Sequence, residues 1–345
     1  MTSFGKVTRR TLLCGAAAAA ISSPGLVFGK AADQLKLSLE FRIYGGNAPM
    51  FLAIENGIYQ KLGLEVIPDG SAGSDECIRR VATGTHPFGL ADASTLIAFA
   101  ARNPAAAPKL VLPIFDRFPA VILSLKPKPI KSLKDLAGIK LGTGTSDAGS
   151  KIFPALLALN NIDPASFDRV TVDVKLRDAM LLAGRVDAVI AFDYTAIFNL
   201  IGNGVKLEDI NLLYFSEFGF DFIGNSLIVN PDVLAKDPDL VRRMALAVAQ
   251  AWVVGSQHRA EAIEAVAKRE RLLDAKVERA RLDWVLDKNV RTENVKKNGL
   301  GTLDIARMQH AISLIKEGFQ LPTAPTVDQI FDSRFMPPAE DRKIG

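Results

Sequence analysis

Short apolar runs alternate with longer stretches of helical periodicity from Leu35 onward. The runs are rich in valine, isoleucine and leucine, and the stretches between them place apolar residues at a helical spacing. This alternation predicts an α/β fold, in which helices cover the faces of a sheet. The first series of strands is expected at 35–41, 64–67, 87–90, 109–114 and 120–125, with helices at 49–59, 74–82 and 94–102.

A segment with two prolines, Lys126-Pro127-Lys128-Pro129, separates this series from a second one. Proline cannot continue a central strand and it stiffens a connection, so we expect this segment to cross between two lobes. A chain of 345 residues is also too long for one compact core. The second series has expected strands at 139–142, 170–174, 186–192 and 212–215, with helices at 150–159, 178–183 and 195–201.

The last extended run, 222–229, precedes a helical region that reaches from 231 almost to 319. We therefore expect the chain to return to the first lobe after the second is complete. The predicted lobes are 32–125 together with 225–345, and 126–224. Each is expected to hold a mixed β-sheet flanked by helices, and two crossing segments would form the hinge.

The first 31 residues have the pattern of an export signal. A basic segment ends in Arg9-Arg10, an alanine-rich apolar stretch covers 11–21, and a small-residue exit allows cleavage after Ala31. This pattern predicts an exported protein that functions in the bacterial periplasm. The paired arginines resemble a twin-arginine signal, although the general secretory route also accepts such a segment.

Charge and reactive side chains exclude several classes of protein. The chain has 42 Lys and Arg against 38 Asp and Glu, but four of the bases lie in the predicted signal, so the mature chain has no net charge. Nucleic acid is therefore not an expected partner. Cys77 is the only mature cysteine and the chain has 3 histidines, which favours neither a metal, nor a cofactor, nor an enzyme.

Several ordered motifs carry a resemblance to a known family. They are Gly46–Ala53, Glu55–Tyr59, Leu62–Val66, Gly70–Ser74, Phe88–Asp92, Leu133–Gly142 and Ala183–Ala188. In this order and spacing they resemble the substrate-binding proteins for aliphatic sulfonates, taurine, nitrate and thiamine precursors. The resemblance covers nearly all of the mature chain.

The resemblance implies the two-lobed fold of type II periplasmic binding proteins. Such a protein closes on a small molecule, works as a monomer and presents its closed form to an ABC permease in the inner membrane. Eukaryotic members of the family synthesise a pyrimidine phosphate with a cysteine-rich motif, which is absent from this sequence. An enzyme of that kind is thus the least favoured alternative, and a ligand sensor for a membrane receptor is another.

The loops after the predicted strands are candidates for the binding site. Ligands of open α/β sheets lie beyond the carboxyl ends of the strands, and these loops are rich in glycine and small hydroxyl residues. The loop 142–150 has free backbone donors for an anion, or it forms a tight turn with Ser146 or Asp147 as the helix N-cap. Its glycine spacing does not fit a dinucleotide fingerprint. The predicted ligand-binding residues are Tyr44, Asn47, Pro49, Ser71, Asp92, Ser94, Thr145, Ser146, Asp147, Asp193, Tyr194 and Asp221.

The acids among these residues, together with Asp116, favour a ligand that carries amino or ring N–H donors. Tyr44, Phe192, Tyr194, Phe220 and Phe222 offer flat stacking surfaces. The hypothesis is a thiamine-precursor pyrimidine or another heteroaromatic or amine-bearing molecule. An alkanesulfonate, taurine, nitrate or an organic carboxylate is the alternative, and each acid could instead cap a helix.

Overall fold

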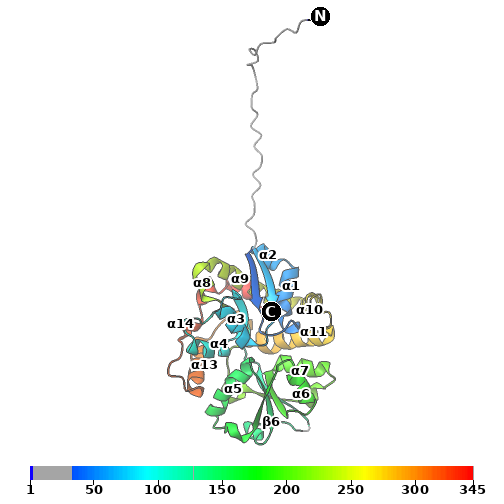
Figure 1. The fold of residues 1–345 in the computed structure, drawn as a ribbon, viewed down its shortest axis with the longest axis vertical. Coiled ribbons are helices and arrows are strands. Elements are labelled where there is room, and N and C mark those ends of the chain that lie inside the picture. The colour runs from blue at the N-terminus through cyan, green and yellow to red at the C-terminus, as the bar shows by residue number, and fades with distance from the viewer. Residues whose placement is uncertain (3–32, 127, 345) are drawn as a thin grey trace. The chain divides into compact units, whose positions relative to one another are not determined.

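The computed structural model describes residues 1–2, 33–126 and 128–344. The chain divides into two units, Met1–Ala31 and Ala32–Gly345, and the second is described below (Figure 1). The predicted export signal, the cleavage point after Ala31 and Pro127 of the predicted crossing lie outside the described residues. Among the described residues, no helix has both the length and the apolar character needed to cross a membrane.

Two five-stranded sheets with the same kind of strand order form the framework. In each sheet four strands run in the same direction, and one inserted strand runs antiparallel to its two neighbours. The first sheet, in spatial order, holds β2 (Leu64–Asp69), β1 (Asp33–Ser38), β3 (Phe88–Asp92), β10 (Asn225–Val229) and β4 (Lys109–Pro113). The second sheet holds β7 (Asp168–Val172), β6 (Lys140–Gly144), β8 (Ala188–Phe192), β5 (Ala120–Leu125) and β9 (Ile210–Tyr214).

Helices flank both sheets, which confirms the predicted two-lobed α/β fold. The first lobe is the first sheet with its helices, and the second lobe is the second sheet with α5 to α7. The helices are α1 (Ala48–Glu55), α2 (Ile58–Lys61), α3 (Ser74–Ala82), α4 (Ala93–Arg102), α5 (Ala148–Leu159), α6 (Arg177–Leu182), α7 (Asp193–Gly202), α8 (Pro231–Lys236), α9 (Pro238–Gln257), α10 (Arg259–Ala267), α11 (Ala275–Trp284), α12 (Glu293–Asn298), α13 (Ile305–Gly318) and α14 (Val327–Ile330). Short 3₁₀ turns occupy Gly45–Asn47, Leu133–Leu136, Pro164–Ser166, Leu207–Asp209, Phe215–Phe218, Ser333–Phe335 and Ala339–Arg342, and a π-helical turn covers Val285–Val290.

The point at which the chain changes lobes differs from the prediction. Strand β5 was expected in the first lobe, but it pairs with β8 and β9 in the middle of the second sheet. The chain therefore crosses at 114–119, before β5, and not at the prolines after it. The segment at Lys126 only ends the strand: Lys126 N donates to Asp209 O (3.1 Å) and Lys128 N to Leu125 O (3.0 Å).

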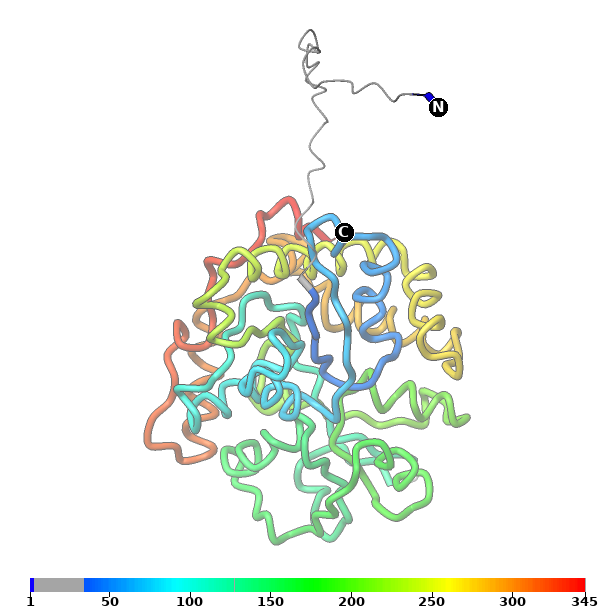
Figure 2. The backbone as a smooth tube through the Cα atoms, turned by 45° about the horizontal axis from the view of Figure 1, so that its top comes forward, coloured from blue at the N-terminus to red at the C-terminus, as the bar shows by residue number. Residues whose placement is uncertain are grey.

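Two straps, 114–119 and 219–224, connect the lobes. They lie side by side, because Gly224 N donates to Phe115 O (2.8 Å), while the N–H groups of Ile114 and Phe115 both donate to Asn225 O. Figure 2 shows the path: the chain leaves the first lobe, completes the second, and returns to the first. The straps thus form the hinge that the two-lobed fold requires.

The C-terminal helices do not all stay on the first lobe. Helix α9 packs against α1, and Trp252 of α9 is buried in the core. Helix α13 reaches the second lobe and packs against α5, while α11 packs against α7 (Figure 1). The two lobes are therefore held together on both flanks of the straps.

Candidate functional site

A cavity of about 360 Å³, its open mouth included, lies between the two lobes. It sits beyond the carboxyl ends of β1, β6 and β8, where an α/β sheet is expected to receive a ligand. Both lobes contribute to its wall. The lining residues are Glu40, Phe41, Ala72, Gly73 and Ser74 from the first lobe, and Asp147, Ala148, Val174, Arg177, Phe192, Tyr194 and Thr195 from the second.

Glu40 supplies a buried carboxylate from the first lobe. It follows β1 by two residues and its side chain is almost fully buried. One oxygen, Oε1, accepts a hydrogen bond from the Tyr44 hydroxyl at 2.9 Å. The other oxygen, Oε2, is buried without a partner among the described residues. Burial raises the pKa of Glu40, because the charged form loses its hydration.

Asp147 supplies a second carboxylate from the opposite lobe. It is the N-cap of α5, and its Oδ1 accepts from Ser150 N at 2.8 Å. Its Oδ2 is buried and has no partner among the described residues. Burial raises the pKa of Asp147, while the positive charge of Arg177 acts in the opposite direction. Each lobe thus contributes to the lining a residue with one buried, unpaired carboxylate oxygen.

Arg177 is the cation of the cavity wall, and it is buried at the start of α6. Its Nε donates to Asp178 Oδ1 at 2.8 Å, and a terminal nitrogen donates to Thr195 Oγ1 at 3.3 Å. Asp178 also accepts from Asn199 Nδ2 at 2.6 Å. The charge of Arg177 is therefore already balanced by a neighbouring carboxylate.

Phe41, Phe192 and Tyr194 line the cavity, and Tyr44 packs behind them. Tyr44 and Tyr194 stack with centroids 6.1 Å apart and an interplanar angle of 5°. Phe192 leans against Tyr194 at 5.8 Å, and Phe41 meets Tyr44 edge to face at 6.1 Å. The Tyr194 hydroxyl accepts from Asn225 Nδ2 at 3.1 Å, which ties this ring to the first sheet. Such rings suit a flat ligand.

The lobes touch at the rim of the cavity. Asp75 N donates to Ser146 O at 3.2 Å, and Lys151 Nζ lies 3.3 Å from Asp75 Oδ2. Gly73 has φ +140, and a Cβ atom there would lie 2.4 Å from Ser146 O, so only glycine allows this approach. The structure thus has its lobes closed over the cavity.

Two of the predicted ligand-binding residues, Asp147 and Tyr194, line the cavity. Phe192, predicted as a stacking surface, lines it too. Ser146 reaches the rim through its backbone, and Thr145 beside it is exposed to solvent. The loop 142–150 keeps its donors occupied, because Gly144 N donates to Ser150 Oγ at 2.9 Å and Asp147 caps the helix. The helix-cap interpretation of this loop is therefore the one that its hydrogen bonds follow.

Four predicted residues of the first lobe brace loops and do not line the cavity. Tyr44 lies behind Glu40, and its N–H donates to Asn47 Oδ1 at 3.2 Å. Pro49 packs against Gly255 of α9. Ser71 Oγ donates to Leu39 O at 2.7 Å. These side chains already satisfy local backbone groups or pack in the core, so they are not free to face a ligand.

Asp92 and Ser94 also have a local role. Asp92 is the N-cap of α4, and its Oδ1 accepts from Ser94 N at 2.8 Å and from Thr95 N at 3.2 Å. Both residues are fully buried and outside the lining of the cavity that contains Glu40 and Asp147, called the main cavity below because both lobes supply its wall. Burial raises the pKa of Asp92 to about 7.

Asp193 and Asp221 face a different pocket, of about 1140 Å³ with its open solvent included. Asp193 Oδ2 accepts from Trp284 Nε1 and from the Tyr214 hydroxyl, both at 3.0 Å. Asp221 is exposed and pairs with Arg307 at 2.8 Å. Neither lines the cavity that contains Glu40 and Asp147, because strand-end acids can point to either side of the sheet edge.

The remaining acid and aromatic candidates belong to the hinge and the core. Asp116 lies on a strap and accepts from Arg307 at 3.2 Å. Phe220 and Phe222 are buried against each other, with centroids 5.3 Å apart. Neither ring lines the main cavity.

Sequence reasoning missed Glu40 and Arg177. The strand was predicted to run to 41, which hid Glu40, whereas β1 ends at Ser38 and makes Glu40 a strand-end acid. A charged residue inside an apolar run was the available signal. Arg177 lay just before the predicted helix and gave no comparable signal.

Neither a cysteine nor a histidine is among the described residues that line this cavity. Cys77 is buried and its Sγ donates to Ser38 O at 3.4 Å. Burial raises the pKa of Cys77 to about 12, so the thiol stays protonated at neutral pH. The part of the chain that the structure describes contains no group of three or more His, Cys, Asp or Glu residues that could hold a metal ion.

Two sheets of this strand order, joined by paired straps around a cavity, define a two-lobed periplasmic binding protein fold. The sequence matches the family described as NMT1/THI5 like over residues 46–262. The chain belongs to this family, as the motifs from Gly46 onward had indicated.

Relatives and solved structures agree with this assignment. The riboflavin-binding protein RibY of Chloroflexus aurantiacus is 24% identical over 232 residues, which are 67% of this chain and 65% of RibY. The match therefore covers less than two thirds of RibY. The alkanesulfonate-binding protein SsuA from Xanthomonas axonopodis pv. citri, bound to MOPS, has a TM-score of 0.65 at 15% identity, with 88% of this chain and 100% of that chain covered. The ligand-binding component of an ABC-type import system from Staphylococcus aureus has a TM-score of 0.64 at 11% identity, with 88% and 97% covered. At these identities the two structures show the fold alone.

Proposed function

We propose that this protein is the periplasmic solute-binding component of an ABC importer and captures a small organic molecule between its lobes. The family, the cavity between two hinged lobes and the predicted export signal support this role. The structurally similar Staphylococcus aureus protein is itself part of an ABC-type import system. Capture follows from closure, because only the closed form brings both walls of the cavity to one ligand.

The ligand class follows from one observation: Glu40 Oε2 and Asp147 Oδ2, on opposite lobes, are buried acceptors without partners. A buried carboxylate oxygen needs a donor, so the ligand supplies N–H groups or a positive charge. The rings of Phe192 and Tyr194 add a surface for a flat molecule. A thiamine-precursor pyrimidine, or another heteroaromatic or amine-bearing molecule, has both properties. RibY, a relative, is named for binding riboflavin, which is also a flat heteroaromatic compound.

A sulfonate, taurine or carboxylate ligand is the second candidate. Arg177 lines the cavity, and the structurally similar SsuA is an alkanesulfonate-binding protein. However, Arg177 is paired with Asp178, and an anion would lie beside two further carboxylates. Repulsion from these charges makes the anionic ligand the weaker proposal.

Titration calorimetry of the mature protein tests both candidates. The panel contains aminopyrimidines, riboflavin, alkanesulfonates, taurine and nitrate. We expect an aminopyrimidine or a flavin to bind, and Glu40→Gln and Asp147→Asn each to weaken that binding at least about tenfold through loss of a charged acceptor. Asp304→Asn is the matched control, because Asp304 caps α13 at an exposed position. Tight binding of sulfonates or nitrate, with none of the ring compounds bound, would contradict the proposed ligand class.

A further inference from the structure

A buried ion pair on α11 lies between the lobes, outside the lining of the cavity. Arg281 Nε donates to Glu278 Oε2 at 2.9 Å, and a terminal nitrogen donates to Glu278 Oε1 at 3.1 Å. The side chains are only 2% and 5% exposed. Two buried charges are stable only if their remaining hydrogen-bonding groups also find partners.

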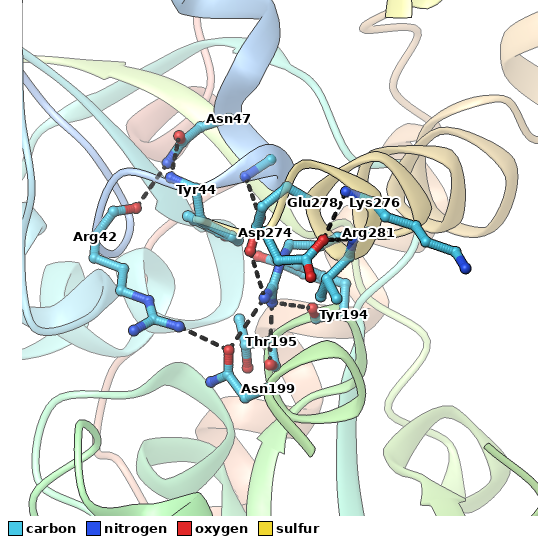
Figure 3. A network of polar contacts seen from close by, with 12 residues as sticks. Arg42, Tyr44, Asn47, Tyr194, Thr195, Asn199, Asp274, Lys276, Glu278 and Arg281 are labelled. Carbon is cyan, nitrogen blue, oxygen red and sulfur yellow. Dashed lines mark hydrogen bonds and ion pairs between the residues drawn. The ribbon is translucent and has the colours of Figure 1, made fainter. Parts of the chain in front are cut away.

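Those partners come from both lobes (Figure 3). On the first lobe, Gly45 N donates to Glu278 Oε2 at 2.6 Å, and the Arg281 guanidinium lies 5.2 Å from the centre of the Tyr44 ring. On the second lobe, Arg281 donates to Tyr194 O at 2.7 Å and to Thr195 O at 3.1 Å. It also donates to Asn199 Oδ1 at 3.1 Å, and Arg42 of the first lobe donates to the same oxygen at 2.7 Å.

This arrangement couples the ion pair to any opening of the lobes. If α11 moves with the first lobe, the bonds from Arg281 to Tyr194 and Thr195 break. If α11 moves with the second lobe, the contacts with Gly45 and Tyr44 break instead. Either motion breaks charge-assisted hydrogen bonds that join the lobes, so the pair favours the closed form whichever way the helix moves.

The fit at Gly45 is a second, independent sign of close contact. A Cβ atom on Gly45 would lie 2.3 Å from the backbone oxygen of Glu278, which a side chain cannot do. The same contacts fix the two stacked tyrosines, because Arg281 touches the ring of Tyr44 and the backbone of Tyr194. Tyr194 lines the cavity, and Tyr44 holds Glu40 through its hydroxyl.

We propose that Glu278 and Arg281 are positioning residues that hold the lobes closed and align Tyr44 and Tyr194 beside the cavity without touching the ligand. The effect on ligand affinity rests on the proposed capture function, whereas the effect on lobe closure does not. A ligand meets a preformed site more often when the closed form is already populated, so its apparent affinity rises with that population.

Pulsed electron–electron double resonance on the ligand-free mature protein tests whether this ion pair holds the lobes closed. Spin labels at Gln60→Cys and Lys134→Cys report the distance between the lobes, and the buried Cys77 stays unlabelled. Arg281→Lys keeps the charge beside Glu278 but loses the planar fork that reaches both lobes. Gly45→Ala changes no charge and acts from the first lobe. Arg279→Gln is the control, since Arg279 forms an exposed pair with Asp283 on the same helix.

We expect the wild type and Arg279→Gln to give one short distance between the labels. Arg281→Lys and Gly45→Ala should add a longer distance, and their ratio of closed to open molecules should be at least about tenfold lower than that of the wild type. Circular dichroism confirms that each variant is folded. For any compound that binds in the calorimetric panel, the dissociation constant is expected to rise by the same factor. Folded variants with unchanged distances would overturn the proposal, and so would changed distances with unchanged affinity. If no compound binds, the distances still decide the role in closure, while the capture function fails separately.

Discussion

Helices α11 and α13 both reach from the C-terminal region to the second lobe, but they hold it by different interactions. Helix α13 packs against α5 within one apolar cluster, to which α13 contributes Met308, Ala311 and Ile315. Helix α11 has an edge contact between the rings of Trp284 and Phe198 of α7 at 6.0 Å, and it adds the hydrogen bonds of Arg281 and the bond from Trp284 to Asp193. Apolar packing has no preferred direction, whereas hydrogen bonds are lost over a small displacement.

The two straps are bonded to α13, the helix that makes the apolar contact with α5. Arg307 of α13 donates to Asp116 O on one strap at 2.7 Å and to Phe222 O on the other at 2.9 Å. We therefore expect the lobes to pivot about the contact between α13 and α5, which stays packed. The contact between α11 and α7 is expected to break when the lobes open. Four experiments test this contrast, beginning with the largest expected effect.

Glu278→Ala should destabilise the protein most. It leaves Arg281 buried without its counter-ion, which costs about 3–5 kcal/mol of unfolding free energy. Chemical denaturation measures the loss. The double variant Glu278→Gln with Arg281→Met removes both charges and should lose less. A loss of unfolding free energy under about 1 kcal/mol for Glu278→Ala would contradict a strong buried ion pair between Glu278 and Arg281.

Gly318→Ala should disturb the apolar contact to a smaller degree. A Cβ atom at Gly318, the last residue of α13, would lie 2.4 Å from the Cβ of Ala155 in α5. Overpacking of this kind costs about 1–3 kcal/mol. Gly202→Ala is the matched control, since Gly202 ends α7 with open space around it. Equal unfolding free energies for the two variants would contradict close packing between α13 and α5.

The cavity between the lobes should show its buried carboxyl group as a pH dependence of stability. Because the pKa of Glu40 is raised in the folded protein, the native state holds its proton more tightly than the unfolded chain. The stability of the wild type therefore falls as pH rises from the unfolded pKa through the folded one, and Glu40→Gln removes that fall. We expect the stability of the variant relative to the wild type to rise with pH across this interval. A difference that does not change with pH in urea unfolding would contradict a buried carboxyl.

Lys151→Ala should have the smallest effect. Lys151 is 40% exposed in its pair with Asp75 across the rim, and such pairs contribute about 0–1 kcal/mol. Thermal unfolding at low and high salt measures the contribution, which should vanish as salt screens it. A loss comparable to that of Glu278→Ala would remove the distinction between the rim and α11.

Much of the fold could be predicted, because the elements follow local patterns. The strand Ala120–Leu125 and the helix Ser74–Ala82 have the bounds expected from the sequence. The sheet in which β5 lies could not be predicted, because a proline-rich segment after a strand has the same sequence whether the strand ends or the chain changes lobes. Pairing between distant strands decides that question, and local patterns do not contain it.

The site was less predictable than the fold. Asp193 and Tyr194 are neighbours at the start of α7, yet only Tyr194 lines the main cavity, since consecutive helical residues point about 100° apart. Asp92 and Asp147 both cap helices at strand ends, but only Asp147 meets the facing lobe. Strand-end position selects candidates, and the orientation of each side chain then depends on packing.

The central place of β5 in the second sheet determines how this protein could be divided. A fragment cut at 126–224 would lack the strand that joins β8 to β9, although both would remain in the piece. It would expose one bare edge on β8 and leave β9 without any neighbour. Bare strand edges pair with other chains, so such a fragment should aggregate, whereas a piece that begins before Ala120 keeps the whole sheet.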